Sequence, residues 1–299
     1  GVQTCALPIL RRALDEGSAL VALTVPPRFQ ADLLAGRPAP VQMQIDATNT
    51  ALAFLAYSHA AQIVTRFGLE QAASGAGDAA AAELPMVDNR PRVWFNPNQD
   101  DAWFMSISEL LNVITAFAIL LPAAAMVREK ERGTIEQLLV SPLTPLQIML
   151  PKVLAMMGVI HLGIAIAFAT VLGPVFHVPV RGSLLLFFAV TTLYVASLSA
   201  LGMFIATVTR NMAQTAMLGI LVLAPMIFLS GMWTPPEAMP TFVRALTRLS
   251  PLHYYMDASY GILLKGAGLA QLWPTVLGIA VLGGAIAGFG LWRFLRQFD

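Results

Sequence analysis

Five consecutive charged residues, Arg128, Glu129, Lys130, Glu131 and Arg132, interrupt the long apolar runs of the sequence. Their mixed sign suits a complementary protein surface, where charged groups set the orientation and the rate of encounter. The simpler interpretation is a loop whose positive charges fix the orientation of neighbouring membrane helices. Acidic residues contribute little to that orientation, so the glutamates of this stretch favour a second role, contact with a cytoplasmic partner.

Catalytic and metal-binding patterns are absent from the sequence. It contains no G-x-x-x-x-G-K-[ST] phosphate loop and no H-E-x-x-H motif. His161, His177 and His253 lack the spacing of metal ligands, and we interpret them as structural. The single cysteine, Cys5, excludes an intramolecular disulfide. We therefore predict that the chain is not itself an enzyme and that it binds neither a metal nor a cofactor.

The composition indicates a membrane protein. Of the 299 residues, 57% are hydrophobic and 12% are charged, whereas a soluble domain carries about 25% charged residues. The net charge of +1 gives no bulk basicity for binding nucleic acid. The apolar residues concentrate in the second part of the chain, from residue 106 to residue 299, which we predict to be a transmembrane domain.

This part holds five stretches close to the ~20 residues that cross a bilayer. They are residues 106–127, 153–174, 183–208, 213–232 and 272–292. The middle three contain no Asp, Glu, Lys or Arg, and the first contains only Glu109. The fold class predicted is therefore an α-helical polytopic membrane protein with five membrane helices in this chain, a loop at 128–152 and another at 233–271.

Residues 10–105 are compatible with water and predict a small α+β domain. Strands are expected at 19–29, 40–48 and 92–97, a helix at 50–67 and a small-residue linker at 73–82. Residues 1–9 look like a translated sequencing adapter, and we expect the natural protein to start upstream of them.

Basic residues predict the orientation in the membrane. The 128–152 loop, the 209–212 turn and the C-terminal tail carry seven Lys and Arg residues, against four in the loops of the opposite side. Since cytoplasmic segments are enriched in these residues, we expect the loop and the C-terminus in the cytoplasm. The domain at 10–105 is then extracytoplasmic.

The stretch "REKERGTIEQLLVSPLTPLQIMLPKVL", residues 128–154, resembles the first cytoplasmic loop of bacterial type-2 ABC exporter permeases. The positions that match the family pattern are Arg128, Glu129, Glu131, Arg132, Gly133, Thr134, Glu136, Leu138, Leu139, Val140, Pro142 and Lys152. "RVWFNP" (92–97) and the segment 230–255 also resemble family segments. The family's first membrane helix is missing here, so six helices are expected in the full-length protein.

The resemblance implies an exporter in the bacterial inner membrane, built from two permease and two ATPase subunits, with ATP and Mg²⁺ on the ATPase. A multidrug-type permease with a large external domain implies a hydrophobic or amphipathic, drug-like or lipid-like substrate, and a periplasmic or outer-membrane export partner. The loop would couple to the ATPase, with Glu129, Arg132 and Glu136 as polar contacts and Gly133 as a bend. Two short helices are expected there, the first with Thr134 and Gln137 at capping-box spacing and the second starting at Thr144 and Pro145.

Two positions depart from the family pattern: Pro151 stands where the family has glycine, and Gln147 where it has an acid.

In the external loop, prolines at 235, 236 and 240 are expected to end the fourth helix. Residues 241–249 have amphipathic helical spacing, and the resemblance implies an external gate that dips into the outer leaflet. Its residues would be Pro235, Pro240, Phe242, Pro251 and Tyr254.

The alternative for that segment is a surface helix resting on the bilayer, with Trp233, Tyr254 and Tyr255 as interface aromatics. In the last helix, Gly284 and Gly288 have the G-x-x-x-G spacing of close helix packing.

A secondary transporter and a non-transporting assembly protein are the alternative functions. The apolar stretches lack the chain of ionisable residues typical of ion-coupled transporters, and a neighbouring gene for an ATPase would favour the exporter.

Overall fold

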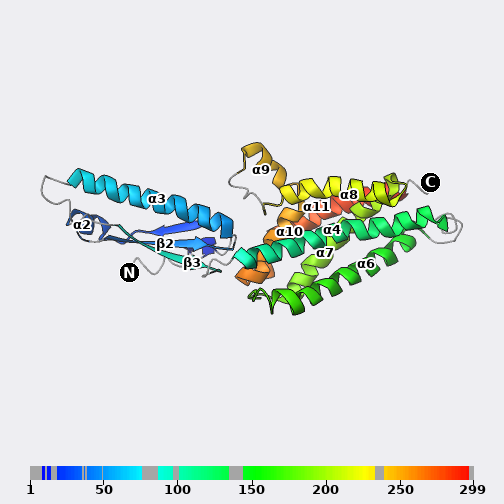
Figure 1. Ribbon diagram of the computed structural model, residues 1–299, viewed down its shortest axis with the longest axis horizontal. Coiled ribbons are helices and arrows are strands. Elements are labelled where there is room, and N and C mark those ends of the chain that lie inside the picture. Colours follow the sequence, from blue (N-terminus) through cyan, green and yellow to red (C-terminus); the bar gives the residue numbers. More distant parts are fainter. Residues whose placement is uncertain are drawn as a thin grey trace. The chain divides into compact units, whose positions relative to one another are not determined.

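The computed structural model describes residues 9–10, 12–14, 19–35, 37, 39–48, 50–75, 87–96, 101–134, 144–232 and 239–295. The chain divides into two compact units, Gly1–Phe104 and Met105–Asp299. A β-sheet with helices forms the first unit, and helices form the second (Figure 1).

The first unit contains a three-stranded sheet with the strand order β1-β2-β3. Its strands are β1 (Val21–Thr24), β2 (Ala39–Asp46) and β3 (Val87–Trp94). β1 runs antiparallel to β2, and β3 runs parallel to β2 with Ala39 opposite Val87. The short helix α2 (Phe29–Leu34) follows β1, and α3 (Thr50–Gly75) lies between β2 and β3 in the chain. Parallel strands need such a crossover connection.

Apolar residues of β2 form the centre of the core of this unit. Met43 and Ile45 are buried together with Ala47, and side chains of α3, including Tyr57 and Val64, pack against them. The strand predicted at 40–48 is thereby confirmed. The strand predicted at 19–29 is shorter, since two prolines follow β1 and proline cannot donate to a ladder. The helix extends beyond residue 67 to Gly75, and the remainder of the expected linker, 76–82, lies outside the described residues.

The second unit is helical. It comprises α4 (Asp101–Glu131), α6 (Pro145–Ala167) continued by the π-helix η1 (Phe168–Leu172), α7 (Leu184–Val208), α8 (Met212–Phe228), α9 (Thr241–Thr247), α10 (Pro251–Tyr260), the π-helix η3 (Gly261–Lys265) and α11 (Leu269–Leu295). Within the described residues, four helical segments are long and apolar enough to cross a membrane. They are Asp101–Glu131, Gln147–Leu172, Leu184–Val208 and Leu269–Arg293. The second unit therefore has the character of a helical polytopic membrane protein.

The two most buried of the four long apolar segments contain α4 and α7. In α4, 56% of the most apolar window is buried inside the chain, against 11% in the segment that contains α6. The helices α4 and α7 approach closely at Gly202, where a Cβ atom would lie 2.2 Å from the carbonyl oxygen of Ile119. On the other side of α7, Gly283 and Gly290 of α11 lie close to Ser197 and Ala200.

Three predicted boundaries change in the structure. Residues 128–131, expected in a loop, form the last turn of α4, because no helix breaker occurs before Gly133. The helix start predicted at Thr144 and Pro145 is confirmed, but that helix is not separate and short: it is the beginning of the second crossing, which was expected from residue 153. Its start is a capping box: the Gln147 backbone N–H donates to the Thr144 hydroxyl, and the Gln147 side chain accepts from the Thr144 N–H. The helix continues through Pro151.

The fourth crossing, expected at 213–232, is also shorter than predicted. α8 has 17 residues and ends at Phe228, several residues before the prolines that were expected to stop it. Ser230 donates its hydroxyl hydrogen to the carbonyl of Ile227 at 2.6 Å. Gly231 has a φ of 89°, a left-handed conformation that glycine adopts without a Cβ clash. The chain therefore turns after Phe228, earlier than residue 232, where hydropathy predicted the end of the fourth crossing.

Candidate functional site

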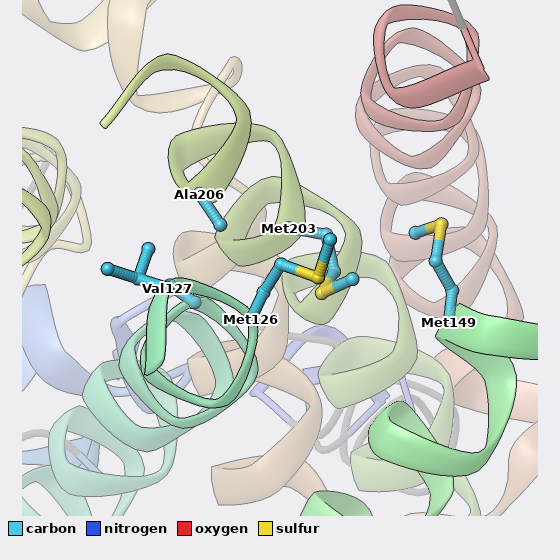
Figure 2. Packing of buried hydrophobic residues seen from close by; sticks show 6 residues of the cluster. Met126, Val127, Met149, Met203 and Ala206 are labelled. Atoms are coloured by element: carbon cyan, nitrogen blue, oxygen red, sulfur yellow. The ribbon is translucent and has the colours of Figure 1, made fainter. Parts of the chain in front are cut away.

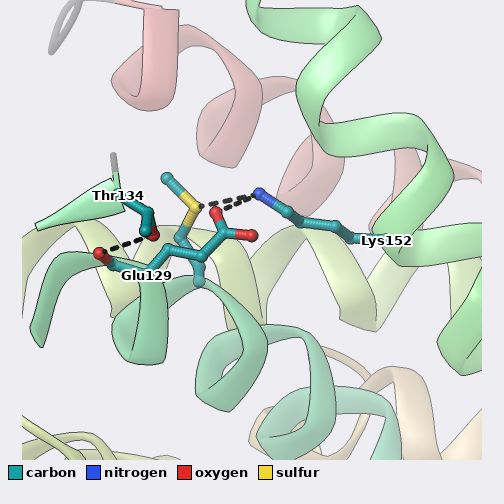
Figure 3. Close-up of polar contacts among 4 residues, drawn as sticks. Glu129, Thr134 and Lys152 are labelled. Carbon is teal, nitrogen blue, oxygen red and sulfur yellow. Dashed lines mark hydrogen bonds and ion pairs between the residues drawn. The ribbon is translucent and has the colours of Figure 1, made fainter. Parts of the chain in front are cut away.

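The charged end of α4 contacts the start of α6 through an ion pair. The Nζ atom of Lys152 lies 2.5 Å from Oε2 of Glu129, and the two side chains are only 16% and 28% exposed. Figure 3 shows the Glu129 carboxylate directed toward Lys152 across the space between the two helices. A pair shielded from water to this degree is screened less by salt than a surface pair, so it links α4 to α6.

Lys130, one residue further along, contacts the end of α7. Its ammonium group donates to the carbonyl oxygen of Ala206, and it lies 3.3 Å from that of Thr207 and 3.5 Å from that of Thr209. The last carbonyls of a helix have no partner within the helix and carry partial negative charge. The lysine therefore supplies a cation and hydrogen-bond donors where α7 needs both.

Glu131 completes this set of contacts at the start of α8. Its Oε1 atom accepts a hydrogen bond of 2.8 Å from the backbone N–H of Met212, the first residue of α8. A carboxylate is favourable at a helix N-terminus, where N–H groups are unpaired. Three consecutive residues, Glu129, Lys130 and Glu131, thus join α4 to α6, α7 and α8, and we call them the charged tie.

An apolar cluster lies next to the charged tie. Met126 and Val127 of α4, Met203 and Ala206 of α7 and Met149 of α6 are buried against one another (Figure 2). Partly buried side chains of α8 and α11 pack on the same cluster. The contacts place the end of α4, the turn at 209–212 and the end of α11 at one end of the second unit, which agrees with their predicted placement on one side of a membrane.

Arg128 and Arg132 differ from the three residues between them. Both are exposed, as Glu131 also is, and the difference lies in their contacts. No hydrogen bond or ion pair of either guanidinium occurs within the described part of the chain. Gly133 follows with a φ of 68°, a left-handed conformation at the position of the predicted bend. The Thr134 hydroxyl donates to the carbonyl of Glu129 at 3.2 Å. Glu136 and Gln137, with the first short helix predicted there, lie outside the described residues.

Sequence reasoning missed the role of Lys130, because the family pattern leaves its position unspecified. The only signal was its place between two glutamates at the end of an apolar run. For Glu129, the internal pair with Lys152 adds a role that was not expected. Its contact with an ATPase, like that of Glu136, stays a prediction.

The external segment is only partly described. Pro235 lies outside the described residues, whereas Pro240 directly precedes α9 and Phe242 within that helix is 73% exposed. Pro251 is buried at the first position of α10, and Tyr254 lies against Gly278 of α11. No contact described here tests their role as a gate.

The prediction that Tyr255 is an interface aromatic is wrong. Its side chain is fully buried and stacks on Tyr194 of α7 with the ring centroids 4.0 Å apart. The phenol group of Tyr255 is hydrogen-bonded to the hydroxyl of Thr191 at 2.8 Å. The buried ring therefore fixes α10 to α7.

The two glycines predicted to pack in α11 are open within this chain. No described atom lies within 4 Å of a Cβ built at Gly284 or Gly288, while their neighbours Gly283 and Gly290 face α7. Close packing at Gly284 and Gly288, for which no partner helix was named, stays a prediction. His161 hydrogen-bonds to the Thr192 hydroxyl at 2.9 Å and so connects α6 to α7.

We expect that swapping the two charges of the Glu129–Lys152 pair destabilises the protein less than reversing the charge of one partner alone. Glu129→Lys alone places two cations together in a half-buried site and should cost about 1.5–3 kcal/mol, the range for charged hydrogen bonds. Combining it with Lys152→Glu should recover more than half of that loss. Thermal unfolding of the four purified proteins in detergent forms a double-mutant cycle that measures the coupling. Arg128→Glu, an exposed change on the same turn, serves as the control, and strictly additive losses would contradict the pairing.

Comparison with known proteins shows that the chain is similar to transport proteins. A family described as "ABC-2 family transporter protein" matches residues 9–293. The inner membrane transport permease YhhJ of Escherichia coli K12 is 36% identical over 288 residues, covering 95% of this chain and 75% of the relative. The probable multidrug ABC transporter permease YbhR of the same strain is 31% identical over 281 residues, covering 92% and 74%.

ABC transporter G family member 20 of Dictyostelium discoideum is a more distant relative, 26% identical over 199 residues that cover 64% of this chain and 27% of that protein. The bacterial matches support the class of multi-pass permeases of ABC transporters in the inner membrane. The chain belongs to the ABC-2 transporter family.

Proposed function

We propose that the chain is the membrane permease subunit of an ABC exporter that moves a hydrophobic or amphipathic, drug-like or lipid-like substrate out of the cytoplasm. A separate ATPase subunit would bind ATP with Mg²⁺ and hydrolyse it. Two permease chains, alike or different, would combine with two ATPase subunits. A periplasmic or outer-membrane protein is a further proposed partner, in keeping with the folded unit that precedes the membrane helices. The names of the bacterial relatives, a transport permease and a multidrug permease, support this proposal.

The charged tie is the observation that carries the proposal. Glu129, Lys130 and Glu131 join one helix end to three other helices, so a force applied at residues 128–134 would reach all four together. The charge count supports a cytoplasmic position for this end, with the unit Gly1–Phe104 on the outside. Arg128 and Arg132 remain exposed beside the charged tie and would face the ATPase.

We expect the double reversal Arg128→Glu with Arg132→Glu to separate the permease from its ATPase. Like charges brought together at an interface cost several kcal/mol, so co-purification of the ATPase should fall about tenfold or more. The measurement is the ATPase retained by affinity-tagged permease, with ATP hydrolysis in proteoliposomes as the second readout. Arg248→Glu, at an exposed arginine that follows α9, is the matched control.

Three results would count against this function. The first is wild-type permease that retains no ATPase. The second is a double variant that retains the ATPase and hydrolyses ATP as the wild type does. The third is an equal loss in the Arg248→Glu control. Size-exclusion elution of the isolated permease variants distinguishes loss of the partner from loss of the fold, since both arginines are exposed.

A further inference from the structure

A groove opens on the surface of the second unit where α7 turns into α8. Its volume is about 440 Å³, within the range of about 300–1,000 Å³ that is usual for ligand sites. The residues that line it are Val208, Thr209, Arg210, Gln214, Met217, Leu218 and Leu221. It lies outside the charged tie and serves no step of the proposed transport function.

The lining changes from polar to apolar along α8. Gln214, Met217, Leu218 and Leu221 are spaced so that they share one helix face, and this face runs about 10 Å along the helix. Met217 and Leu221 are 75% and 69% exposed, so the groove wall is apolar surface that the described chain leaves uncovered. In a membrane helix such a wall contacts hydrocarbon.

The polar end of the groove offers hydrogen-bond donors. The Arg210 guanidinium has only donors, and it forms no hydrogen bond or ion pair within the described residues. The side-chain oxygen of Gln214 already accepts from the Arg210 backbone N–H at 3.0 Å, which leaves its NH₂ group as a donor. The Thr209 hydroxyl is engaged, donating to the carbonyl of Ile205 and meeting the Thr215 hydroxyl at 2.8 Å.

The charge around this end is positive. Lys130 lies 3.5 Å from the carbonyl oxygen of Thr209, which lines the groove. The nearby carboxylate of Glu131 is directed to the backbone of Met212, and none of the lining residues is acidic. Unpaired guanidinium groups bind phosphate oxygens strongly and in a bidentate manner.

We propose that this groove binds an anionic phospholipid, with the phosphate at Arg210 and Gln214 and an acyl chain along Met217 and Leu221. Both parts of the lipid are needed to account for the lining. A free anion would leave the apolar wall uncovered, and a zwitterionic lipid would bring its own cation next to the phosphate, in competition with the guanidinium. Basic residues at the ends of membrane helices are suited to anionic headgroups.

The test uses the delipidated full chain in detergent and counts bound lipid by native mass spectrometry. The probes are dioleoyl-phosphatidylglycerol, dioleoyl-phosphatidylcholine and glycerol phosphate. The wild type should bind the anionic lipid about fivefold more tightly than the zwitterionic one, equivalent to about 1 kcal/mol for one arginine near a membrane surface. Arg210→Gln should abolish this preference, and Leu221→Ser should weaken both lipids.

Arg293→Gln, an exposed arginine in the last turn of α11 that does not line the groove, is the matched control. It should keep the preference for the anionic lipid. The proposal is overturned if Arg210→Gln keeps that preference, or if the control loses it equally. It is also overturned if glycerol phosphate at the same concentration displaces the lipid completely, since the acyl chain would then contribute nothing.

Discussion

Replacement of Gly202 by alanine is expected to lower the stability of the permease by about 1–3 kcal/mol, the usual cost of overpacking a well-packed core. The added Cβ would lie 2.2 Å from the carbonyl oxygen of Ile119 and 3.1 Å from its carbonyl carbon. These are backbone atoms of α4, so no change of rotamer relieves the clash. The helices α4 and α7 must move apart.

The measurement is the thermal unfolding midpoint of purified protein in detergent, together with the monodisperse fraction in size-exclusion chromatography. Gly163→Ala in α6 is the control, because nothing described lies within 4 Å of its Cβ position. That change should be neutral or stabilising, since alanine exceeds glycine in helix propensity by about 1 kcal/mol. Truncating Ile119 to alanine should not rescue Gly202→Ala. An unchanged midpoint for Gly202→Ala, or a rescue by that truncation, would refute the close approach.

Lys130→Met is expected to weaken the contact between the end of α4 and the end of α7. It keeps the length of the side chain but removes the ammonium group from the carbonyls of Ala206, Thr207 and Thr209. A hydrogen bond to a charged group contributes about 1.5–3 kcal/mol to stability in mutational measurements. We therefore expect the free energy of unfolding to fall by an amount in that range. Because the contact joins α4 to α7, ATP hydrolysis by the assembled transporter should lose its response to substrate.

Arg128→Met provides the matched comparison, since Arg128 is exposed and forms no hydrogen bond or ion pair in the described part of the chain. It should leave the unfolding midpoint of the isolated permease unchanged. Equal midpoints for the Lys130 and Arg128 variants would show that the lysine contributes nothing to the end of α7. Lys130→Arg, which keeps the charge and the donors, should recover part of the stability.

Much of the fold follows from local patterns in the sequence. The boundary of α7 was predicted to within one residue, because Ser183 caps the helix and an uninterrupted apolar run follows. The alternation of apolar and polar residues at 41–46 likewise predicted a strand, and β2 forms there. Both depend on interactions between residues that are close in the chain, where sequence spacing determines geometry.

Other features depend on distant partners. Residues 128–131 looked like a loop because they are charged, yet they continue α4, and three of them contact Lys152, Ala206 and Met212. Tyr255 looked like an interface aromatic, yet the space beside Tyr194 buries it. Nothing in the local sequence specifies such neighbours.

Hydropathy and motif spacing are local properties, and they were enough to predict a membrane protein, the approximate positions of its long helices and the family loop that it carries. The division of roles among the five charged residues became apparent from the folded structure alone. Glu129, Lys130 and Glu131 contact other helices through a lysine, unpaired carbonyls and a backbone N–H group, whereas the two arginines form no such contact within the described residues. That division depends on which helix ends meet in space, and helix ends meet through packing over the whole unit.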